Sequence, residues 1–237
     1  MPGQGGFVVA TLPLPDTEHA ANRTPLIAAI GSAVLTVASF LALGVAPTDQ
    51  AGGQEIVTWF TVNGGPVRLF SWLLTAFIPV FATFAAVVRS RLPAPHRDVF
   101  LLGAAGFLAQ TAVSLWFWAG LSWHPGQVDP ATARTLLDLV SFWGPILNGA
   151  TISMLAPVVV LSWGRRAILP RWLGVVGAIA LAEQAVESVL TIFGQSGFVA
   201  PGGPMNLMLG AGLVTIWVVC LGVALTKLPV HRGPETG

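Results

Sequence analysis

Two glutamates, Glu183 and Glu187, lie four residues apart inside an otherwise apolar stretch that is long enough to cross a membrane. At about 100° per residue on a helix, they share one sector with Gln184, Ser188 and Thr191. A carboxylate in hydrocarbon is costly, so such residues usually face the interior of a helix bundle or a water-filled cavity. The spacing therefore predicts a polar wedge on one helix face, and any functional site should be sought there.

The surroundings of this wedge favour a protonated carboxyl group. No Lys, Arg or His lies at the predicted depth of the two glutamates, and burial together with mutual repulsion disfavours two charges. A neutral carboxylic acid in an apolar pocket can protonate an alkene, an epoxide or a carbonyl group. We predict Glu183, the deeper residue, as the catalytic acid and Glu187 as the group that tunes it or relays its proton.

Further polar and aromatic residues fall at a similar predicted depth on neighbouring helices. Asp138 is a third candidate catalytic acid, although its position four residues after Arg134 also fits an interfacial ion pair. The predicted substrate-binding residues are Gln110, Ser114, Trp116, Trp143, Asn148, Gln184 and Ser188. Intramembrane amides and hydroxyls also serve as interhelical hydrogen bonds worth about 1 kcal/mol each. This alternative applies to Gln110, Asn148, Ser32, Thr36 and Ser39.

The sequence offers neither a metal site nor a cofactor motif. Two glutamates four residues apart supply too few ligands for a metal ion. The histidines, which would complete such a site, all fall in predicted loops or tails: His19, His96, His124 and His231. The single cysteine, Cys220, can form neither an intrachain disulfide nor a paired-thiol site. Aspartate-rich motifs that hold magnesium and a prenyl diphosphate are absent, so we expect chemistry without a metal or a cofactor.

The composition is that of a membrane protein. Hydrophobic residues make up 54% of the 237 residues and charged residues only 9%, with a mean hydropathy of +0.76. A soluble globular protein carries about 25% charged residues. The net charge is +1 and the cations are scattered through loops, which leaves no basic surface for a nucleic acid. The expected partners are the bilayer, a lipophilic small molecule or lipid, and in one alternative another protein.

Six apolar stretches have the length of about 20 residues that crosses a bilayer. They run over 25–45, 68–88, 99–123, 134–163, 172–193 and 205–225. We therefore predict an all-α bundle with six transmembrane helices over residues 25–227. Residues 1–24 are predicted to be a disordered tail, and residues 228–237 a second tail. The length of the first apolar run favours a retained anchor over a cleaved signal.

The cations predict the orientation, since Lys and Arg are enriched in cytoplasmic loops. Of the 11 cations, 9 fall on one predicted side: Arg23, Arg89, Arg91, Arg97, Arg165, Arg166, Arg171, Lys227 and Arg232. Arg68 and Arg134 fall on the other side. Both termini are therefore predicted to be cytoplasmic, in the inner (plasma) membrane.

Two connecting regions have structural signals of their own. Residues 55–60 could form a short interfacial helix, and Asn63-Gly64-Gly65-Pro66 is a turn signal, so residues 46–67 are expected to form an outer lid. Asp129 and Pro130 predict the start of a fourth helix of about 34 residues. Kinks are expected within it near Pro145 and Pro157, because proline lacks the backbone donor.

The chemistry of a buried acid with aromatic neighbours resembles that of the small integral-membrane terpene cyclases, which protonate an isoprenoid. This resemblance rests on chain length, span number and buried acids. The segments 57–60, 63–68 and 169–174 also resemble small multi-span actinobacterial proteins of unknown function. The first resemblance implies a cyclase or isomerase that acts on an isoprenoid-type substrate, and the second implies no catalytic residue.

Two other functions are compatible with the same residues. A proton-coupled or cation-coupled transporter uses paired intramembrane carboxylates equally well, although the two halves of the chain show no matching Pro or Gly interruptions of the kind found in inverted repeats. A non-catalytic assembly or regulatory subunit could pack the polar wedge against a partner. The acid-catalysed enzyme is the first expectation, and both alternatives stay open.

Overall fold

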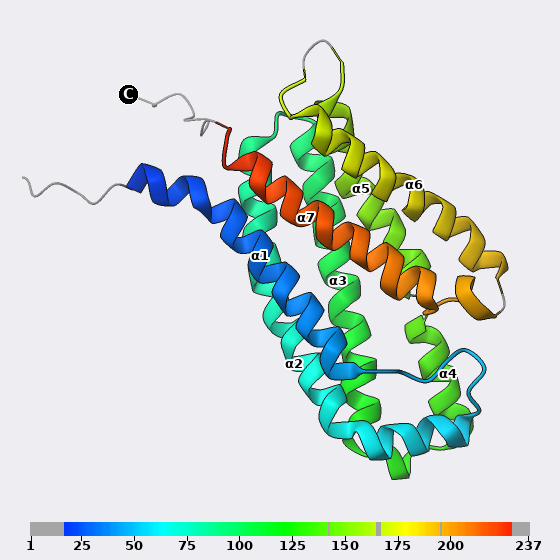
Figure 1. The fold of residues 1–237 in the computed structure, drawn as a ribbon. Helices are drawn as coiled ribbons and strands as arrows, with labels where there is room; N and C mark the ends of the chain where they lie inside the picture. The colour runs from blue at the N-terminus through cyan, green and yellow to red at the C-terminus, as the bar shows by residue number, and fades with distance from the viewer. Residues whose placement is uncertain (1–16, 142, 165–166, 195, 229–237) are drawn as a thin grey trace, which may run out of the picture.

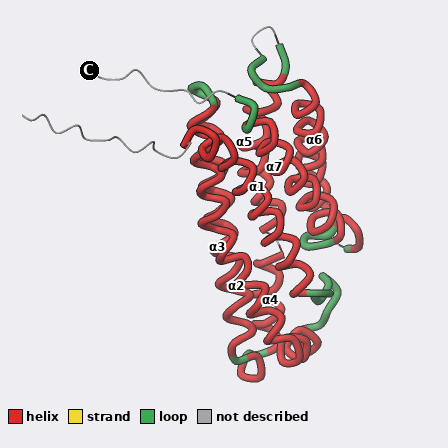
Figure 2. The backbone as a smooth tube through the Cα atoms, turned by 60° about the vertical axis from the view of Figure 1, so that its left-hand side comes forward, coloured by secondary structure: helices red, strands yellow, loops and turns green. Residues whose placement is uncertain are grey.

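The computed structural model describes residues 17–141, 143–164, 167–194 and 196–228, and every regular element in these ranges is a helix (Figures 1 and 2). The main helices are α1 (Thr17–Leu43), α2 (Gly53–Arg91), α3 (His96–Trp123), α4 (Pro130–Ser141), α5 (Trp143–Ser162), α6 (Arg171–Phe193) and α7 (Ala211–Leu225). Three short elements lie in the connections: the 3₁₀ turns η1 (Pro125–Gln127) and η2 (Gly197–Val199), and the π-helix η3 (Met205–Gly210), which leads directly into α7. The fold is an all-α bundle, as predicted.

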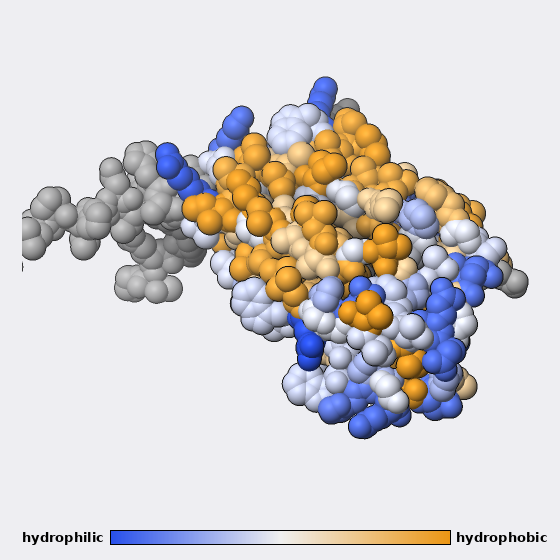
Figure 3. Space-filling view, turned by 60° about the horizontal axis from the view of Figure 1, so that its bottom comes forward, coloured by the Kyte–Doolittle hydropathy of each residue, from blue (hydrophilic) through white to orange (hydrophobic). Residues whose placement is uncertain are grey.

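Five helical stretches of the described chain are long and apolar enough to cross a membrane. They are Arg23–Leu43, Gly53–Arg91, His96–Trp123, Arg171–Thr191 and Met205–Leu225, while Asn148–Ser162 is a shorter apolar helix. Large apolar side chains such as Leu41, Leu102 and Phe193 are exposed on the sides of the bundle. Figure 3 shows orange apolar surface over one flank and blue hydrophilic surface at the end of the molecule that comes forward. The protein is thus a polytopic helical membrane protein.

Six helices form a closed ring. The contacts run from α1 to α2, α3, α5, α6 and α7, and α7 returns to α1. The start of α1 and the end of α7 lie at the same end of the bundle (Figure 1). At that end the Arg91 guanidinium donates to the backbone oxygens of Leu225 and Leu228, at 3.3 and 2.8 Å, so the end of α2 is fastened to the end of α7.

Buried aromatic side chains fill two regions of the bundle. Phe77, Phe81 and Phe107 pack with ring centroids 5.1 to 6.1 Å apart between α2 and α3. Toward the other end, Trp118 packs against Phe60 and Phe70 at 5.6 and 5.7 Å. Such pairs add roughly 0.5–1.5 kcal/mol each beyond the burial of apolar area. The two clusters therefore stabilise the α2 and α3 side of the ring.

The predicted fourth helix corresponds to α4 and α5, with residue 142 between them outside the described residues. Pro145 lies in the first turn of α5, where its missing N–H is tolerated. Pro157 lies within α5, which continues through it. The prediction of one continuous helix of about 34 residues includes residue 142 and so falls in part outside the described residues.

The prediction of a turn at Asn63-Gly64-Gly65-Pro66 was wrong, because α2 runs through these residues from Gly53 to Arg91. The cyan ribbon in Figure 1 lies across the lower end of the bundle and then turns sharply upward as α2. Pro66 lacks a backbone donor and so permits a bend without ending the helix. The expected interfacial helix at residues 55–60 is therefore the first section of α2, and it closes this end of the bundle.

The N-terminal prediction needs a smaller correction. Residues 17–24 are helical and belong to α1, although residues 1–24 were expected to be a disordered tail. This stretch contains Glu18, Ala20 and Ala21, which favour helix, so the helix begins before the apolar run. Residues 1–16 and 229–237, which make up most of the two predicted tails, lie outside the described residues.

Candidate functional site

The polar wedge of α6 meets α5 in the interior of the ring. The Asn148 side-chain amide donates to Glu187 Oε2 at 3.1 Å and contacts the backbone oxygen of Gln184 at 3.3 Å. Glu187 is fully buried, and Asn148 is only 2% exposed. A buried charged or polar group is costly unless it is hydrogen-bonded. The hydrogen bond from Asn148 of α5 therefore offsets part of the cost of burying the Glu187 carboxyl group of α6.

Gln184 connects the two glutamates. Its Nε2 atom donates to Glu183 Oε2 at 2.8 Å and to Glu187 Oε2 at 3.3 Å. The second oxygen, Oε1, of each glutamate is buried and has no hydrogen-bond partner among the described residues. A carboxylate accepts hydrogen bonds, whereas a protonated carboxyl group also donates one. These two oxygens are thus the positions in the site where a proton can be held.

The π-helix η3 packs against this cluster through a glycine. A Cβ atom added at Gly210 would lie 2.9 Å from Gln184 Nε2, 3.0 Å from Glu187 Oε2 and 3.3 Å from Glu183 Oε2. The absence of a side chain at Gly210 therefore lets the backbone approach all three polar groups. π-Helical turns are rare and are frequent at functional sites.

Asn206, one turn earlier in η3, contributes a second amide. Its side chain lies within hydrogen-bonding reach of the Glu187 carboxyl group. It is 8% exposed, and its Oδ1 atom has no hydrogen-bond partner in the part of the chain that the structure describes. The Glu187 carboxyl group is therefore surrounded by amides from three elements, α5, α6 and η3.

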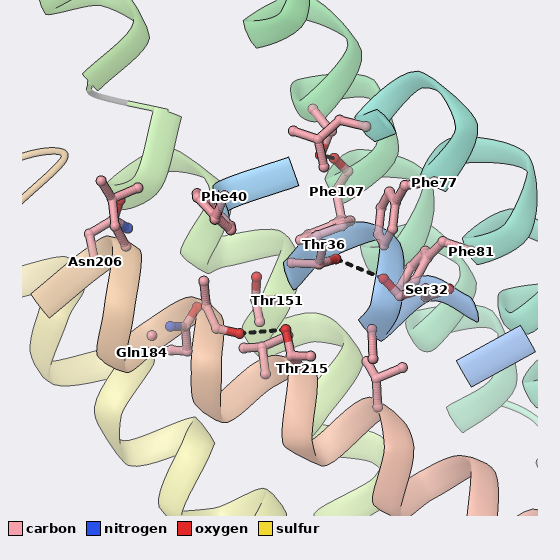
Figure 4. A pocket seen from close by; sticks show the side chains of 18 of the residues that line it. Ser32, Thr36, Phe40, Phe77, Phe81, Phe107, Thr151, Gln184, Asn206 and Thr215 are labelled. Carbon is pink, nitrogen blue, oxygen red and sulfur yellow. Dashed lines mark hydrogen bonds between the residues drawn. The ribbon is translucent and has the colours of Figure 1, made fainter. Parts of the chain in front are cut away.

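A cavity of about 90 Å³ adjoins this cluster. Each helix of the ring contributes to its lining, which is predominantly apolar (Figure 4). Four phenylalanines line it: Phe40, Phe77, Phe81 and Phe107. The polar lining residues are Ser32, Thr36, Thr111, Asn148, Thr151, Gln184, Asn206 and Thr215. The two glutamates do not line the cavity, and Gln184, Asn148 and Asn206 lie between Glu187 and the cavity.

The structure brings several predicted site residues together. Glu183, Glu187, Gln184 and Asn148 form one hydrogen-bonded cluster. Ser188 lies beside them and donates to the backbone oxygen of Gln184 at 2.7 Å. The polar faces of α5 and α6 therefore converge, which the shared depth allowed but did not by itself predict.

Other predicted residues lie elsewhere. Asp138 forms an ion pair with Arg134, whose Nε atom is 3.2 Å from Asp138 Oδ2, so it occupies the alternative position foreseen for it. Trp116 is 73% exposed on the outside of the bundle. Ser114 is buried, Gln110 Oε1 is buried without a partner among the described residues, and neither residue lines the cavity. Trp143 starts α5, and its side chain lies outside the described residues.

Sequence reasoning missed most of the cavity. Thr111, Thr151, Asn206 and the phenylalanines were not predicted, while Ser32 and Thr36 were expected only as interhelical contacts. Both hydroxyls donate to backbone oxygens within α1, at 2.8 and 2.9 Å. Asn206 was the strongest available signal, because it is a lone amide at the start of the last apolar stretch. A phenylalanine in an apolar helix gives no such signal, since an apolar side chain is tolerated both in lipid and in the core.

The described residues of this site offer hydrogen bonding, proton binding and contact with aromatic rings. No group of three or more His, Cys, Asp or Glu residues that could hold a metal ion occurs within the described ranges. No protein-family model, curated protein or solved structure matches this chain.

Proposed function

We propose that this protein crosses the plasma membrane six times with both termini in the cytoplasm. The sixth span is α5, which is 20 residues long and therefore has the length of a transmembrane helix. An even number of spans agrees with the start of α1 and the end of α7 lying at one end of the bundle (Figure 1). The distribution of Lys and Arg supports the cytoplasmic side for that end.

Within this frame, the function that the geometry supports best is proton-linked binding of a small lipophilic molecule, as in a proton-coupled transporter. One observation carries this proposal: Asn148 and Gln184 line the cavity and also hydrogen-bond to the buried Glu187. A change in the protonation of Glu187 changes whether these two amides must offer it an N–H donor or an oxygen acceptor. Proton binding and ligand binding therefore act on the same two side chains.

The coupling follows from the hydrogen-bonding capacity of each group. An ionised Glu187 only accepts, so it orients amide N–H groups toward itself and leaves amide oxygens for the ligand. A protonated Glu187 donates through its O–H, which favours the opposite orientation of one amide and presents an N–H group to the cavity. Ligand and proton then influence each other reciprocally.

The charges around Glu187 are few. The elements packed against α6 are α5, η2, η3 and α7. The only titratable side chain on them is Cys220 of α7. On α6 itself, Glu183 is one turn away, whereas Arg171 lies about 24 Å away at 1.5 Å per residue. Glu183 is therefore the main charged neighbour, and it favours a single proton shared between the two carboxyl groups.

An acid-catalysed cyclase or isomerase, as in the small integral-membrane terpene cyclases, is the second candidate. The four phenylalanines of the cavity favour it, because aromatic faces stabilise a developing cation by about 0.5–2 kcal/mol per ring. It requires Glu183 or Glu187 to reach the substrate past Gln184 and Asn148. It ranks second because neither carboxyl group lines the cavity.

The test uses reconstituted protein and the photoactivatable apolar probe 3-trifluoromethyl-3-phenyldiazirine. Labelling of peptides that line the cavity is measured by mass spectrometry from acid to neutral pH. We expect labelling of the wild type to depend on pH and that of Glu187→Gln to be independent of pH, since glutamine keeps one donor group and one acceptor at every pH. Infrared absorption of the protonated carboxyl group should change over the same pH range in the wild type and be reduced in Glu187→Gln.

Glu183→Gln is the matched variant and should keep a pH dependence with a displaced midpoint. Labelling of the wild type that is independent of pH would refute proton-linked binding. Lipid profiles of cells carrying Glu183→Gln or Glu187→Gln test the second candidate, the enzyme. An accumulated acyclic or unisomerised lipid would favour it. Wild-type behaviour of both variants in all assays would favour a non-catalytic subunit that uses the wedge for packing.

A further inference from the structure

We propose that the natural ligand of the cavity is a neutral lipid-soluble alcohol, which enters from the bilayer between α1 and α7 and donates its hydroxyl hydrogen to Asn206. This inference rests on the proposed function only in using the same cavity. It adds the class of ligand, its direction in the cavity and its entry route.

The entry route follows from the way α1 and α7 meet. A Cβ atom at Gly222 would lie 2.6 Å from Ala29 Cβ and 3.1 Å from the backbone oxygen of Pro25, so the two backbones touch at this crossing. From there the blue and orange helices diverge toward their other ends (Figure 1). The cavity lies on the diverging side, with Thr36 and Phe40 from α1 and Leu207 and Thr215 facing them from η3 and α7.

Side chains along both edges of this divergence are partly exposed. Ala33 and Thr36 on α1 and Ala211 and Thr215 on α7 are neither fully buried nor fully exposed. Of the partly exposed residues that line the cavity, seven lie on α1, η3 and α7, whereas Leu74 and Phe107 are the two on the other walls. The accessible side of the cavity is therefore the α1 and α7 side, which faces lipid in a membrane-spanning bundle.

The cavity has one end with side-chain amides and another end with several aromatic rings. In Figure 4, Gln184 and Asn206 lie on one side of the view, while Phe77, Phe81 and Phe107 lie on the other beside Thr36 and Ser32, whose hydroxyls donate to backbone oxygens of α1. A ligand that fits both ends has one polar group and a hydrocarbon body. About 90 Å³ exceeds the ~30 Å³ share of one water but is less than the ~150 Å³ apolar cavity that holds benzene. The rest of a longer molecule must therefore extend into the bilayer.

The unpaired acceptor atom of Asn206 indicates which polar group the ligand carries. Its Oδ1 is a buried acceptor without a donor among the described residues, and leaving such an atom unpaired costs about 1–3 kcal/mol. A hydroxyl group supplies that donor. A carboxylate is disfavoured, because no Lys, Arg or His lines the cavity and two carboxyl groups lie behind it. An ammonium group would need contact with a carboxylate, and Gln184 and Asn148 occupy the intervening space.

The experiment uses three photoactivatable probes on reconstituted wild-type protein. Each carries a diazirine on the same medium-length alkyl chain, which ends in a hydroxyl, a methyl ether or a primary amine. We expect the alcohol to label peptides containing Phe77, Phe81 or Phe107 at least several-fold more than the ether or the amine does. An excess of the unlabelled alcohol should compete with this labelling. Asn206→Leu, which removes the acceptor, should reduce labelling by the alcohol to the level of the ether.

The entry route is tested by narrowing one edge of the opening. Ala33→Phe places a ring between α1 and α7 and should remove labelling of the cavity peptides, while Val37→Phe, at a position 53% exposed on α1, should leave it unchanged. Equal labelling by alcohol and ether, stronger labelling by the amine, or full labelling of Ala33→Phe would overturn the proposal. These results are independent of the pH profile of Glu187→Gln, so the inference and the proposed function can fail separately.

Discussion

The Asn148 amide donates to the buried Glu187 carboxyl group at 3.1 Å across the contact between α5 and α6. The same amide also reaches the backbone oxygen of Gln184. Asn148 thus contacts residues that lie 36 and 39 positions further along the chain. An amide of α5 and the polar wedge of α6 are thus combined in one site. The first prediction concerns this pair.

Replacing Asn148 by alanine should destabilise the protein by about 1–3 kcal/mol, because it removes the hydrogen bond that Asn148 donates to a buried carboxyl group. The free energy of unfolding is measured by denaturant titration in detergent micelles for Asn148→Ala, Glu187→Gln and the double variant. We expect a coupling energy of about 0.5–3 kcal/mol between the two substitutions. Additive effects would show that the hydrogen bond contributes nothing to stability.

Gly210→Ala should destabilise the protein by about 1–3 kcal/mol, the usual cost of overpacking, and should reduce binding of the apolar probe. The added methyl group would lie within 3.0 Å of both Gln184 Nε2 and Glu187 Oε2. Gly212→Ala is the control, since nothing lies within 4 Å of the Cβ position there. It should be neutral or slightly stabilising, because alanine favours helix over glycine by about 1 kcal/mol. Equal unfolding midpoints would contradict this prediction.

Gly222→Ala should separate α1 from α7 at their crossing, because the new Cβ atom would lie only 2.6 Å from Ala29 Cβ. We expect a loss of about 1–3 kcal/mol together with increased labelling of α1 by a lipid-soluble probe. Gly120→Ala, on α3 with open space at the Cβ position, controls for the change in helix propensity. A stability equal to that of this control would mean that the crossing relaxes without cost.

The ion pair between Arg134 and Asp138 gives a test that separates structure from function. Asp138→Asn should cost less than about 1 kcal/mol, the usual value of a partly exposed pair, and should leave probe binding unchanged. Arg134→Ala should cost more, because Arg134 also donates to the backbone oxygen of Ala51 at 2.9 Å. Loss of binding or of activity in Asp138→Asn would instead place this residue in the functional machinery.

Much of this fold could be predicted from the apolar pattern. The apolar runs located each helix of the ring, and the period of the polar wedge predicted correctly that Glu183, Gln184 and Glu187 share a face. The depth expected for Asn148 matched that of this face, but the sequence did not show whether the two helices face each other. Polar residues are informative here because hydrocarbon penalises them, so their positions are constrained in a way that can be recognised in a sequence.

The remaining differences have local causes. Pro66 and Pro157 lie inside helices, although a turn was predicted at the first, because a proline can bend a helix without ending it. Just before α2, the Arg134 guanidinium donates to the backbone oxygen of Ala51 at 2.9 Å. This contact joins residues 83 positions apart, whose proximity exists only in the folded chain.

The π-helical geometry of Met205–Gly210 bears on how the site can change. Hydrogen bonds in a π-helix span one residue more than those of an α-helix, so conversion of this turn to α geometry would shift its register by one residue relative to α7. Such a shift is a rotation of about 100° and a translation of about 1.5 Å. It would carry Asn206 away from Glu187 while leaving the contact of Gly222 with α1 in place. The position of Asn206 relative to Glu187 therefore depends on this turn keeping its π-helical geometry.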